Sequence, residues 1–493
     1  MLLRHPLVVL TFTSVLTGCA VGPDYKKPDV TLTDHYLASA QTEQRSAVIY
    51  ANLDRWWEGF NDPLLTRFVT IAFNQNLDLA QAAARISQAR SGLSMTNVAL
   101  LPSGTMSASA ARNHQSLETP LGQLLNATPG YDRNGRQYEA NMSASWEMDL
   151  FGGLRRDQEA AIAEYQASEA GRNATRLAVA ANTADLYILI RSLQNRIAIA
   201  QHQLDIQQKL VTLVDLLHGR GLAPTRELDL AKGARAQTQS TIPVLEASLD
   251  EAMNALDVML GVPPGTYRNE LATVQDIPSS PQITSMGTPS DLLRRRPDLI
   301  MAERRLAASN ARIGPAIAEY YPKFSITALL GTATAISSGN IFSSGANQAT
   351  GLLGLRWRLF DFGRINAQID LAKGQEAEAM AAYRQTALRA TEDVENALSS
   401  LIKREEQTSL LLQSENSLSQ ARNSSFLAYQ KGAVSLIEVL HADENLFRTS
   451  DAKAQAQTEA ARSAVSAFKA LGGGWEASSS SHQALSALSM NTD

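Results

Sequence analysis

The chain has 493 residues, with 44 lysines and arginines against 49 aspartates and glutamates, and a single cysteine. One cysteine cannot close a disulfide within the chain or supply a cysteine-based zinc or iron–sulfur site. A net charge of −5 with mixed signs argues against a nucleic-acid binder, which carries a clustered basic surface. The seven histidines are scattered, and no nucleotide-binding or nucleophile-elbow motif occurs. We therefore expect that the protein is not an enzyme and that it binds no metal or cofactor.

The chain opens with the pattern of a bacterial export signal. Arg4 precedes an apolar run over residues 7–16 that is too short to cross a bilayer as a helix. Small residues then precede Cys19, which resembles the lipoprotein signal that is cut just before an acylated cysteine. We predict a signal peptide over residues 1–18 and lipidation at Cys19, or, as the alternative, a leader cut elsewhere. In lipoproteins of this class, an aspartate directly after the acylated cysteine retains the protein at the inner membrane. This chain has Ala20 at that position, so the resemblance implies that the protein is sent to the outer membrane.

After the leader the chain repeats itself, which indicates a tandem duplication. Two sets of residues recur at constant offsets: Asp78, Ala82, Arg85 and Pro102 are matched 220 residues later, and Trp146, Phe151, Gly221 and Glu227 are matched 211 residues later. A nine-residue deletion between the two sets accounts for the change of offset. We predict a first repeat over residues 63–260 and a second over 290–471.

Each repeat is predicted to begin with a helix, over residues 64–100 in the first, and to continue with two strands. Residues 103–112 and 137–150 alternate small or polar with apolar side chains, and residues 323–333 and 350–361 repeat the pattern. Weak alternation of this kind is typical of outer-membrane barrel strands, whose lumen side is polar. A surface hairpin is the alternative interpretation.

A very long helix is predicted after each strand pair. Residues 153–218 and 364–431 contain no proline, and about 65 helical residues extend on the order of 100 Å. In the first of these helices apolar residues recur every seven positions, as in a coiled-coil seam: Ile190, Ile197, Leu204 and Val211, with Leu193, Ala200 and Val214 between them. Each long helix ends in a glycine turn, and further helices are predicted near 225–260 and 435–471.

Four strands per chain cannot close a membrane barrel, because the edge strands would remain unpaired in lipid. Small membrane barrels have at least about eight strands. We therefore predict that the chain oligomerises. Two copies would supply eight strands and three copies twelve, and the strand count alone does not choose between them.

Motifs along nearly the whole mature chain carry a resemblance to a known family. They are Cys19–Tyr25, Trp56–Trp57 with Asn61–Leu64, Trp146–Gly152, Leu292–Asp298 and Leu471–Trp475. In this order, on a duplicated frame, they resemble the outer membrane factor family of Gram-negative efflux and secretion systems, in particular its lipoprotein branch (TolC/OprM-like, NodT-type). The resemblance implies an α+β fold: a trimer with a transmembrane antiparallel β-barrel of twelve strands, four per chain, continuous with a long α-helical coiled-coil barrel. It also implies an equatorial belt, to which we assign residues 19–62, the linker 261–289 and the tail 472–493.

The resemblance also implies a function. Members are passive exit ducts, and we expect a lipid-anchored homotrimer in the outer membrane that extends into the periplasm and contacts no nucleic acid. A periplasmic adaptor (membrane fusion) protein and an inner-membrane pump of the resistance-nodulation-division type would deliver the substrate. Alternatives are a type I-like protein secretion duct and a periplasmic coiled-coil scaffold lipoprotein without a pore. A lipoprotein hydrolase would need a nucleophile and a base in suitable spacing, and we find none.

In the family, the turn after each long helix is the periplasmic end that closes the duct and contacts the adaptor. We assign adaptor contact to Gly221, Leu222, Ala223 and Pro224, and to Gly432, Ala433, Val434 and Ser435. We assign the periplasmic gate to Ile437 and His441, with Asp443 and Glu444 close by. His441 stands where OprM-like relatives carry aspartate, and Asp443 lies about 200° from it on an ideal helix. The alternative is a solvated histidine without a gating role.

Three further features have plainer interpretations. The run of three arginines at residues 294–296, next to a proline, predicts a helix boundary and a solvated face. Trp56, Trp57 and Trp475 are expected to pack in the belt core rather than stack on a ligand. Pro315 is expected to kink or end its helix before the next strand begins.

Overall fold

The computed structural model describes residues 20–38, 50–283, 288–335 and 340–475. These residues form two compact units. The strand unit comprises residues 20–28, 87–167, 303–335 and 340–382, and the helix unit comprises residues 29–38, 50–86, 168–283, 288–302 and 383–475. Among the described residues, no helix is long and apolar enough to cross a membrane. The predicted signal peptide, Cys19 and most of the predicted tail 472–493 lie outside the described residues.

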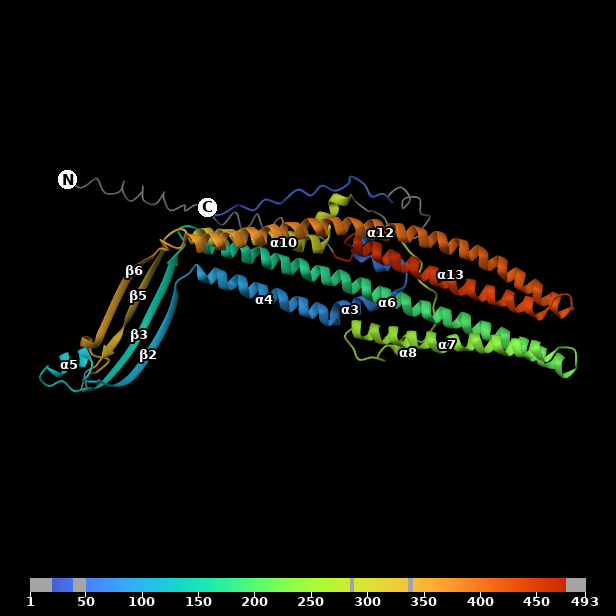
Figure 1. Cartoon of the computed structure of the whole chain (residues 1–493), viewed down its shortest axis with the longest axis horizontal. Helices are drawn as coiled ribbons and strands as arrows, with labels where there is room; N and C mark the ends of the chain where they lie inside the picture. Colours follow the sequence, from blue (N-terminus) through green and yellow to red (C-terminus); the bar gives the residue numbers. More distant parts are fainter. Residues whose placement is uncertain (1–19, 39–49, 284–287, 336–339, 476–493) are drawn as a thin grey trace. The chain divides into compact units, whose positions relative to one another are not determined.

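The strand unit contains one antiparallel sheet of four strands (Figure 1). Its strands are β2 (Ser103–His114), β3 (Asn134–Met148), β5 (Lys323–Thr334) and β6 (Asn347–Arg356), in the order β2-β3-β5-β6. Both predicted strand pairs are therefore present, and they join through β3 and β5. Two strands end earlier than predicted: β3 ends at Met148 rather than at 150, and β6 ends at Arg356 rather than at 361. After Arg356 the chain leaves the sheet, and the indole N–H of Trp357 donates to the Tyr320 carbonyl at 3.0 Å.

Short elements fill the connections. A helix that the sequence pattern did not predict, α5 (Pro120–Asn126), lies between β2 and β3, and a 3-10 turn, η3 (Ser344–Ala346), precedes β6. α5 begins where it does because the Thr119 hydroxyl accepts a hydrogen bond from the Gly122 N–H at 3.1 Å, and Pro120 suits the first helical position.

The predicted first helix is two helices, α3 (Pro63–Gln75) and α4 (Leu77–Ala99). Asn76 separates them, because its side-chain oxygen accepts the N–H groups of Asp78 and Leu79 at 2.9 and 3.1 Å and so caps α4. Its amide nitrogen donates to the Met259 carbonyl at 2.8 Å. The prediction of one continuous helix over 64–100 was therefore wrong at this residue.

The second half begins with η2 (Pro289–Asp291), α9 (Leu292–Arg295), α10 (Pro297–Ala311) and α11 (Ile313–Ala318). The break between α10 and α11 falls at Arg312, which confirms the expected interruption by Pro315. A proline ring clashes with the carbonyl four residues before it, and that residue is Ala311, the last of α10. The break between α9 and α10 falls at Arg296, which confirms the predicted helix boundary.

The helix unit is organised by two long hairpins. The first pairs α6 (Gly153–Gly219) with α7 (Thr225–Met259), and the second pairs α12 (Phe362–Gln430) with α13 (Leu436–Ala470). Within this unit the helices follow the order α12, α13, α6, α7 (Figure 1), as the side-chain contacts that join neighbours also show: Arg422–Asp443, Arg462–Asp185 and Arg235–Gln208. The heptad prediction for α6 is confirmed, because six of its seven positions are less than 9% exposed: Ile190, Leu193, Ile197, Ala200, Val211 and Val214.

Trp56 and Trp57 pack in an aromatic core, as predicted, whereas Trp475 is half-buried. Trp56 and Trp57, on η1 (Leu53–Phe60), are 1% and 5% exposed, and Trp56 stacks on Phe468 of α13 at 5.6 Å between ring centroids. Small elements complete this region: β1 (Tyr50–Ala51) pairs in parallel with β4 (Gln282–Ile283), and α8 (Arg268–Leu271) lies in the predicted linker.

Candidate functional site

The sheet has one apolar face that the chain leaves exposed. Met106, Met142 and Leu330 lie in one row across β2, β3 and β5 and are 78%, 61% and 62% exposed. A second row holds Trp146, Ile326 and Leu353. Because side chains alternate along a strand, polar residues gather on the other face, where the Thr105 and Ser143 hydroxyls are 2.8 Å apart. A sheet with these two faces suits a boundary between lipid and water.

The sheet also has two open edges. β2 and β6 are the outer strands, and among the described residues neither pairs with a further strand on its outer side. All 12 residues of β2 are exposed. An unpaired edge is a template for another strand, and in lipid each unpaired backbone group costs several kcal/mol. Both edges of this sheet are therefore open to pairing with further strands.

The two long hairpins end in the same kind of turn. Gly221 and Gly432 both have a φ of 72°, and the residue after each donates its N–H to the carbonyl five residues earlier. These bonds run from Leu222 to Leu217 and from Ala433 to Ala428, each at 2.9 Å. The pattern is a Schellman cap. The left-handed φ is the reason that both positions are glycine. Crowding is not the reason, because no atom lies within 4 Å of a Cβ added at either position.

The two turns lie next to each other, because residues of both hairpins form one hydrophobic cluster. The cluster includes Val214, Ala223, Leu228, Leu436 and Val439. The structure thus brings together the residues to which we assign adaptor contact. Leu222 is 72% exposed, whereas Ala223 is buried and Val434 half-buried. The other members of the set are exposed: Gly221, Pro224, Gly432, Ala433 and Ser435. We call this end of the helix unit the tip.

The residues assigned to the gate fall on two sides of α13. Ile437 is 40% exposed, and His441 and Glu444 are also exposed. Glu444 pairs with Arg448 at 2.6 Å. Asp443 is 1% exposed and faces α12, as its 200° separation from His441 predicts.

Asp443 forms a buried ion pair that the sequence pattern did not reveal. The Nε atom of Arg422 on α12 donates to its Oδ1 at 2.6 Å, while its Oδ2 is buried without a hydrogen-bond partner. Burial raises the pKa of the Asp443 carboxyl above its ordinary value, and Arg422 opposes that rise. The sequence does contain a hint of this pair. Arg422 lies 211 residues after Val211, so the repeat places a charged residue at a position that is apolar in the coiled-coil seam of the first half.

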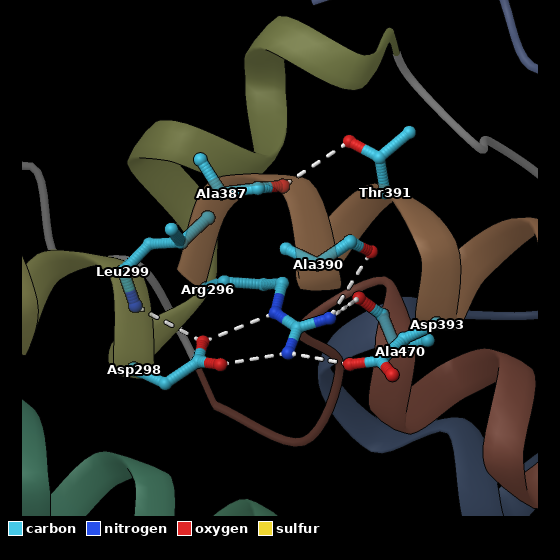
Figure 2. A network of polar contacts seen from close by, with 8 residues as sticks. All are labelled: Arg296, Asp298, Leu299, Ala387, Ala390, Thr391, Asp393 and Ala470. Carbon is cyan, nitrogen blue, oxygen red and sulfur yellow. Dashed lines mark hydrogen bonds and ion pairs between the residues drawn. The ribbon is translucent and has the colours of Figure 1, made fainter. Parts of the chain in front are cut away.

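The run of three arginines also differs from its prediction, because Arg296 is not solvated. Its side chain is 11% exposed and binds Asp298 at 2.7 Å and Asp393 at 3.0 Å. It also donates to the carbonyls of Ala390 and Ala470 at 3.3 Å each (Figure 2). Burial alone would lower the pKa of the Arg296 guanidinium, but the two carboxylates outweigh it and the pKa lies above its ordinary value. Arg296 thus joins the start of α10 to α12 and to the end of α13.

Comparisons with known proteins agree with this geometry. The sequence profile of the family described as Outer membrane efflux protein matches residues 69–262 and 288–473. The pyoverdine export outer membrane protein OpmQ of Pseudomonas putida is 33% identical over 86% of this chain and 89% of its own. Nodulation protein T of Rhizobium leguminosarum bv. trifolii is 30% identical over 94% of this chain and 96% of its own. The solved outer-membrane channel OprN is 31% identical, with a TM-score of 0.83 over 93% of this chain and 100% of that chain.

A sheet with an exposed apolar face and open edges, in a chain that also forms two long helical hairpins, defines the protomer of an outer-membrane channel. The chain belongs to the outer membrane efflux protein family, whose members work with a periplasmic adaptor and an inner-membrane pump. It is an outer-membrane exit duct of an efflux system. The relatives are channels and transport proteins, which points away from an enzymatic role.

Proposed function

We propose that three copies of this chain close a twelve-stranded antiparallel barrel in the outer membrane, continuous with a ring of long helices that conducts substrate passively. The observation that carries the proposal is the pair of open edges, β2 and β6, on a sheet whose apolar face is exposed. Two copies would close a barrel of eight strands, and side chains fill the interior of a barrel of that size. Three copies leave room for a duct.

The duplication supports the same assembly. Gly261 and Gly472, 211 residues apart, follow α7 and α13 and have φ values of 74° and 73°. The pair Gly221 and Gly432 shows the same offset at the two turns. Each chain then contributes two similar hairpins to the ring, so that the wall repeats twice per copy. In this proposal Cys19 carries acyl chains in the outer membrane, the two turns contact a periplasmic adaptor, and a pump of the resistance-nodulation-division type supplies the substrate.

Mass and conductance of the detergent-purified protein test the duct. We expect a particle of three chains that dissociates only on heating, contains β structure, and conducts ions steadily in a planar bilayer. A monomer or dimer, or a trimer without conductance, would contradict the proposal. A trimer without β structure would favour a scaffold without a pore.

His441 provides a prediction for the gate. We propose that Ile437 and His441 of each copy meet at the closed tip, where both are exposed on the surface of α13. Protonation of His441 in each copy would then place like charges together and loosen the tip. Single-channel conductance should rise as the pH falls from about 8 to about 5, and His441→Ala should abolish the rise. Identical pH profiles for the two proteins would refute this role.

A further inference from the structure

The apolar face of the sheet is a band of defined height. It carries no charged side chain between Met148 and Tyr138 of β3, nor at their register partners on the neighbouring strands. These two residues are ten positions apart, which corresponds to about 33 Å along the strand. A strand tilt of about 40° reduces this length to about 25 Å, the height of the apolar band of an outer-membrane barrel. Trp146 near one end and Tyr138 at the other match the aromatic girdles of such barrels.

Two arginines lie just beyond this band. Arg112 and Arg136 are partners in the register of β2 and β3, two residues past the pair of Ala110 and Tyr138 and so about 7 Å further along the strands. Because side chains alternate, both belong to the apolar face, and they are its only charged residues within the four strands. Both are exposed. Side chains directly opposite each other have Cβ atoms about 5 Å apart, so the two guanidinium groups can reach one anion.

The chain itself supplies no anion for this pair. Among the described residues, neither Arg112 nor Arg136 forms an ion pair. The two carboxylates nearest to Arg136 in sequence are placed otherwise: Glu139 belongs to the polar face, and Asp132 accepts the N–H of Asn134 at 2.9 Å. Like charges directly opposite each other destabilise a pair of strands. An anion bound between the two arginines would remove that repulsion.

The place of the arginine pair along the strands decides which leaflet of the membrane it meets. β2 follows α4 and β3 precedes α6, so the helices join the other ends of these strands. Arg112 and Arg136 lie at the end that carries α5 (Figure 1). In the proposed duct the helices extend into the periplasm. The arginine pair then lies at the level of the head groups of the outer leaflet.

We propose that Arg112 and Arg136 of each copy bind a phosphate group of lipopolysaccharide, the anionic glycolipid of the outer leaflet. Guanidinium groups bind phosphate through paired, charge-assisted hydrogen bonds, and two opposed guanidinium groups can hold one phosphate from two sides. The acyl chains of the same lipid then lie along the uncharged band, against Met106 and Met142. A lipid fits this place better than a free anion, because the charge stands directly at the end of an apolar face. The proposal rests on the proposed function for the direction of the sheet, and it adds a lipid-binding site.

Binding of lipid A, the phosphorylated and acylated part of lipopolysaccharide, to the detergent-purified trimer tests the site. We expect Arg112→Gln combined with Arg136→Gln to weaken this binding by at least about tenfold, because hydrogen bonds to charged groups are lost. Glutamine remains polar but carries no charge. Native mass spectrometry counts the bound lipid, and titration gives the affinity. Binding by this double variant as tight as by wild type would overturn the proposal.

Arg356→Gln is the matched control. Arg356 is also an exposed arginine of the sheet without an ion pair among the described residues, but it lies on the polar face, opposite Lys323, where β6 ends before α12. This variant should bind lipid A as wild type does, and a loss equal to that of the double variant would overturn the site. Arg112→Lys combined with Arg136→Lys keeps both charges without the planar forks, and its affinity should fall between the other two.

Two further ligands identify the source of the anion. Lipid A stripped of its phosphates should bind wild type as weakly as intact lipid A binds the glutamine double variant. If the stripped lipid bound as tightly as the intact lipid, the arginines would not hold a phosphate. Inorganic phosphate at about 1 mM should not displace lipid A, because the apolar band also holds the lipid. Displacement at that concentration would indicate a site for free phosphate and overturn the lipid assignment.

The lipid site and the duct fail separately. The glutamine double variant should remain a trimer with the conductance of wild type, because it changes no residue of the helix unit or of the polar face. A wild-type trimer that conducts but does not bind lipid A would overturn the lipid site and leave the duct standing. A wild-type protein that forms no trimer, or that does not conduct, would overturn the duct and with it the direction on which the lipid site depends.

Discussion

Export is expected to fail when aspartate replaces Leu222, although the variant still reaches the outer membrane as a trimer. The Leu222 side chain is 72% exposed at the tip, and its N–H bond to Leu217 does not involve the side chain. Stability should therefore change by less than about 0.5 kcal/mol. A carboxylate buried without a partner against an adaptor costs more than about 1.4 kcal/mol, enough for a tenfold loss of binding. Growth on an exported toxic compound reports export, and outer-membrane fractionation reports the trimer.

Leu216 supplies the matched control for this variant. Like Leu222 it is an exposed leucine, 52% exposed, but it lies on α6 before the turn and outside the set that we assign to adaptor contact. Leu216→Asp should export nearly as wild type. Normal export by Leu222→Asp would show that Leu222 does not contact the adaptor. Equal losses of export in Leu222→Asp and Leu216→Asp would show the same.

The main elements of the fold could be predicted because their signals are local. The turns at Gly221 and Gly432 need a left-handed φ that only glycine adopts readily, so glycine after a long proline-free run marks the end of each hairpin. The alternation in β3 and β5 is likewise a property of neighbouring residues. These signals placed the strands and helices with errors of a few residues.

The break at Asn76 shows where local signals end. The surrounding residues favour helix, and an asparagine within such a run is not decisive. In the structure its amide also donates to the carbonyl of Met259, 183 residues away in sequence. A partner that distant leaves no mark on the local pattern, so a continuous helix was the natural interpretation.

The functional residues divide in the same way. The turn residues were found because the turn itself is visible in the sequence, whereas the burial of Asp443 depends on Arg422 from the neighbouring helix. Three consecutive arginines predict a solvated face, and Arg296 departs from this prediction because most of its partners are distant in sequence. Its acceptors on Ala390 and Ala470 lie 94 and 174 residues away. Charged residues at helix junctions are thus assigned reliably only once their partners are known.

Replacing Arg296 by methionine is expected to destabilise the helix unit by about 2 kcal/mol. Methionine fills much of the same volume but leaves the Ala470 carbonyl, at the open end of α13, without its donor. The loss is moderated because Asp298 and Asp393, 36% and 54% exposed, regain water. Thermal unfolding of the detergent-solubilised protein, followed by circular dichroism, measures the change.

Two further variants distinguish the geometry of Arg296 from its charge. Arg296→Lys keeps the positive charge, but an ammonium lacks the planar fork that reaches two carboxylates and two carbonyls at once, so it should recover less than half of the loss. Arg294→Met removes an exposed arginine two residues earlier and should change stability by less than about 0.5 kcal/mol. If lysine restored wild-type stability, charge alone would explain the site. If Arg294→Met were as harmful as Arg296→Met, the loss would follow from the net charge of this segment, and the bonds to α12 and α13 would not be its cause.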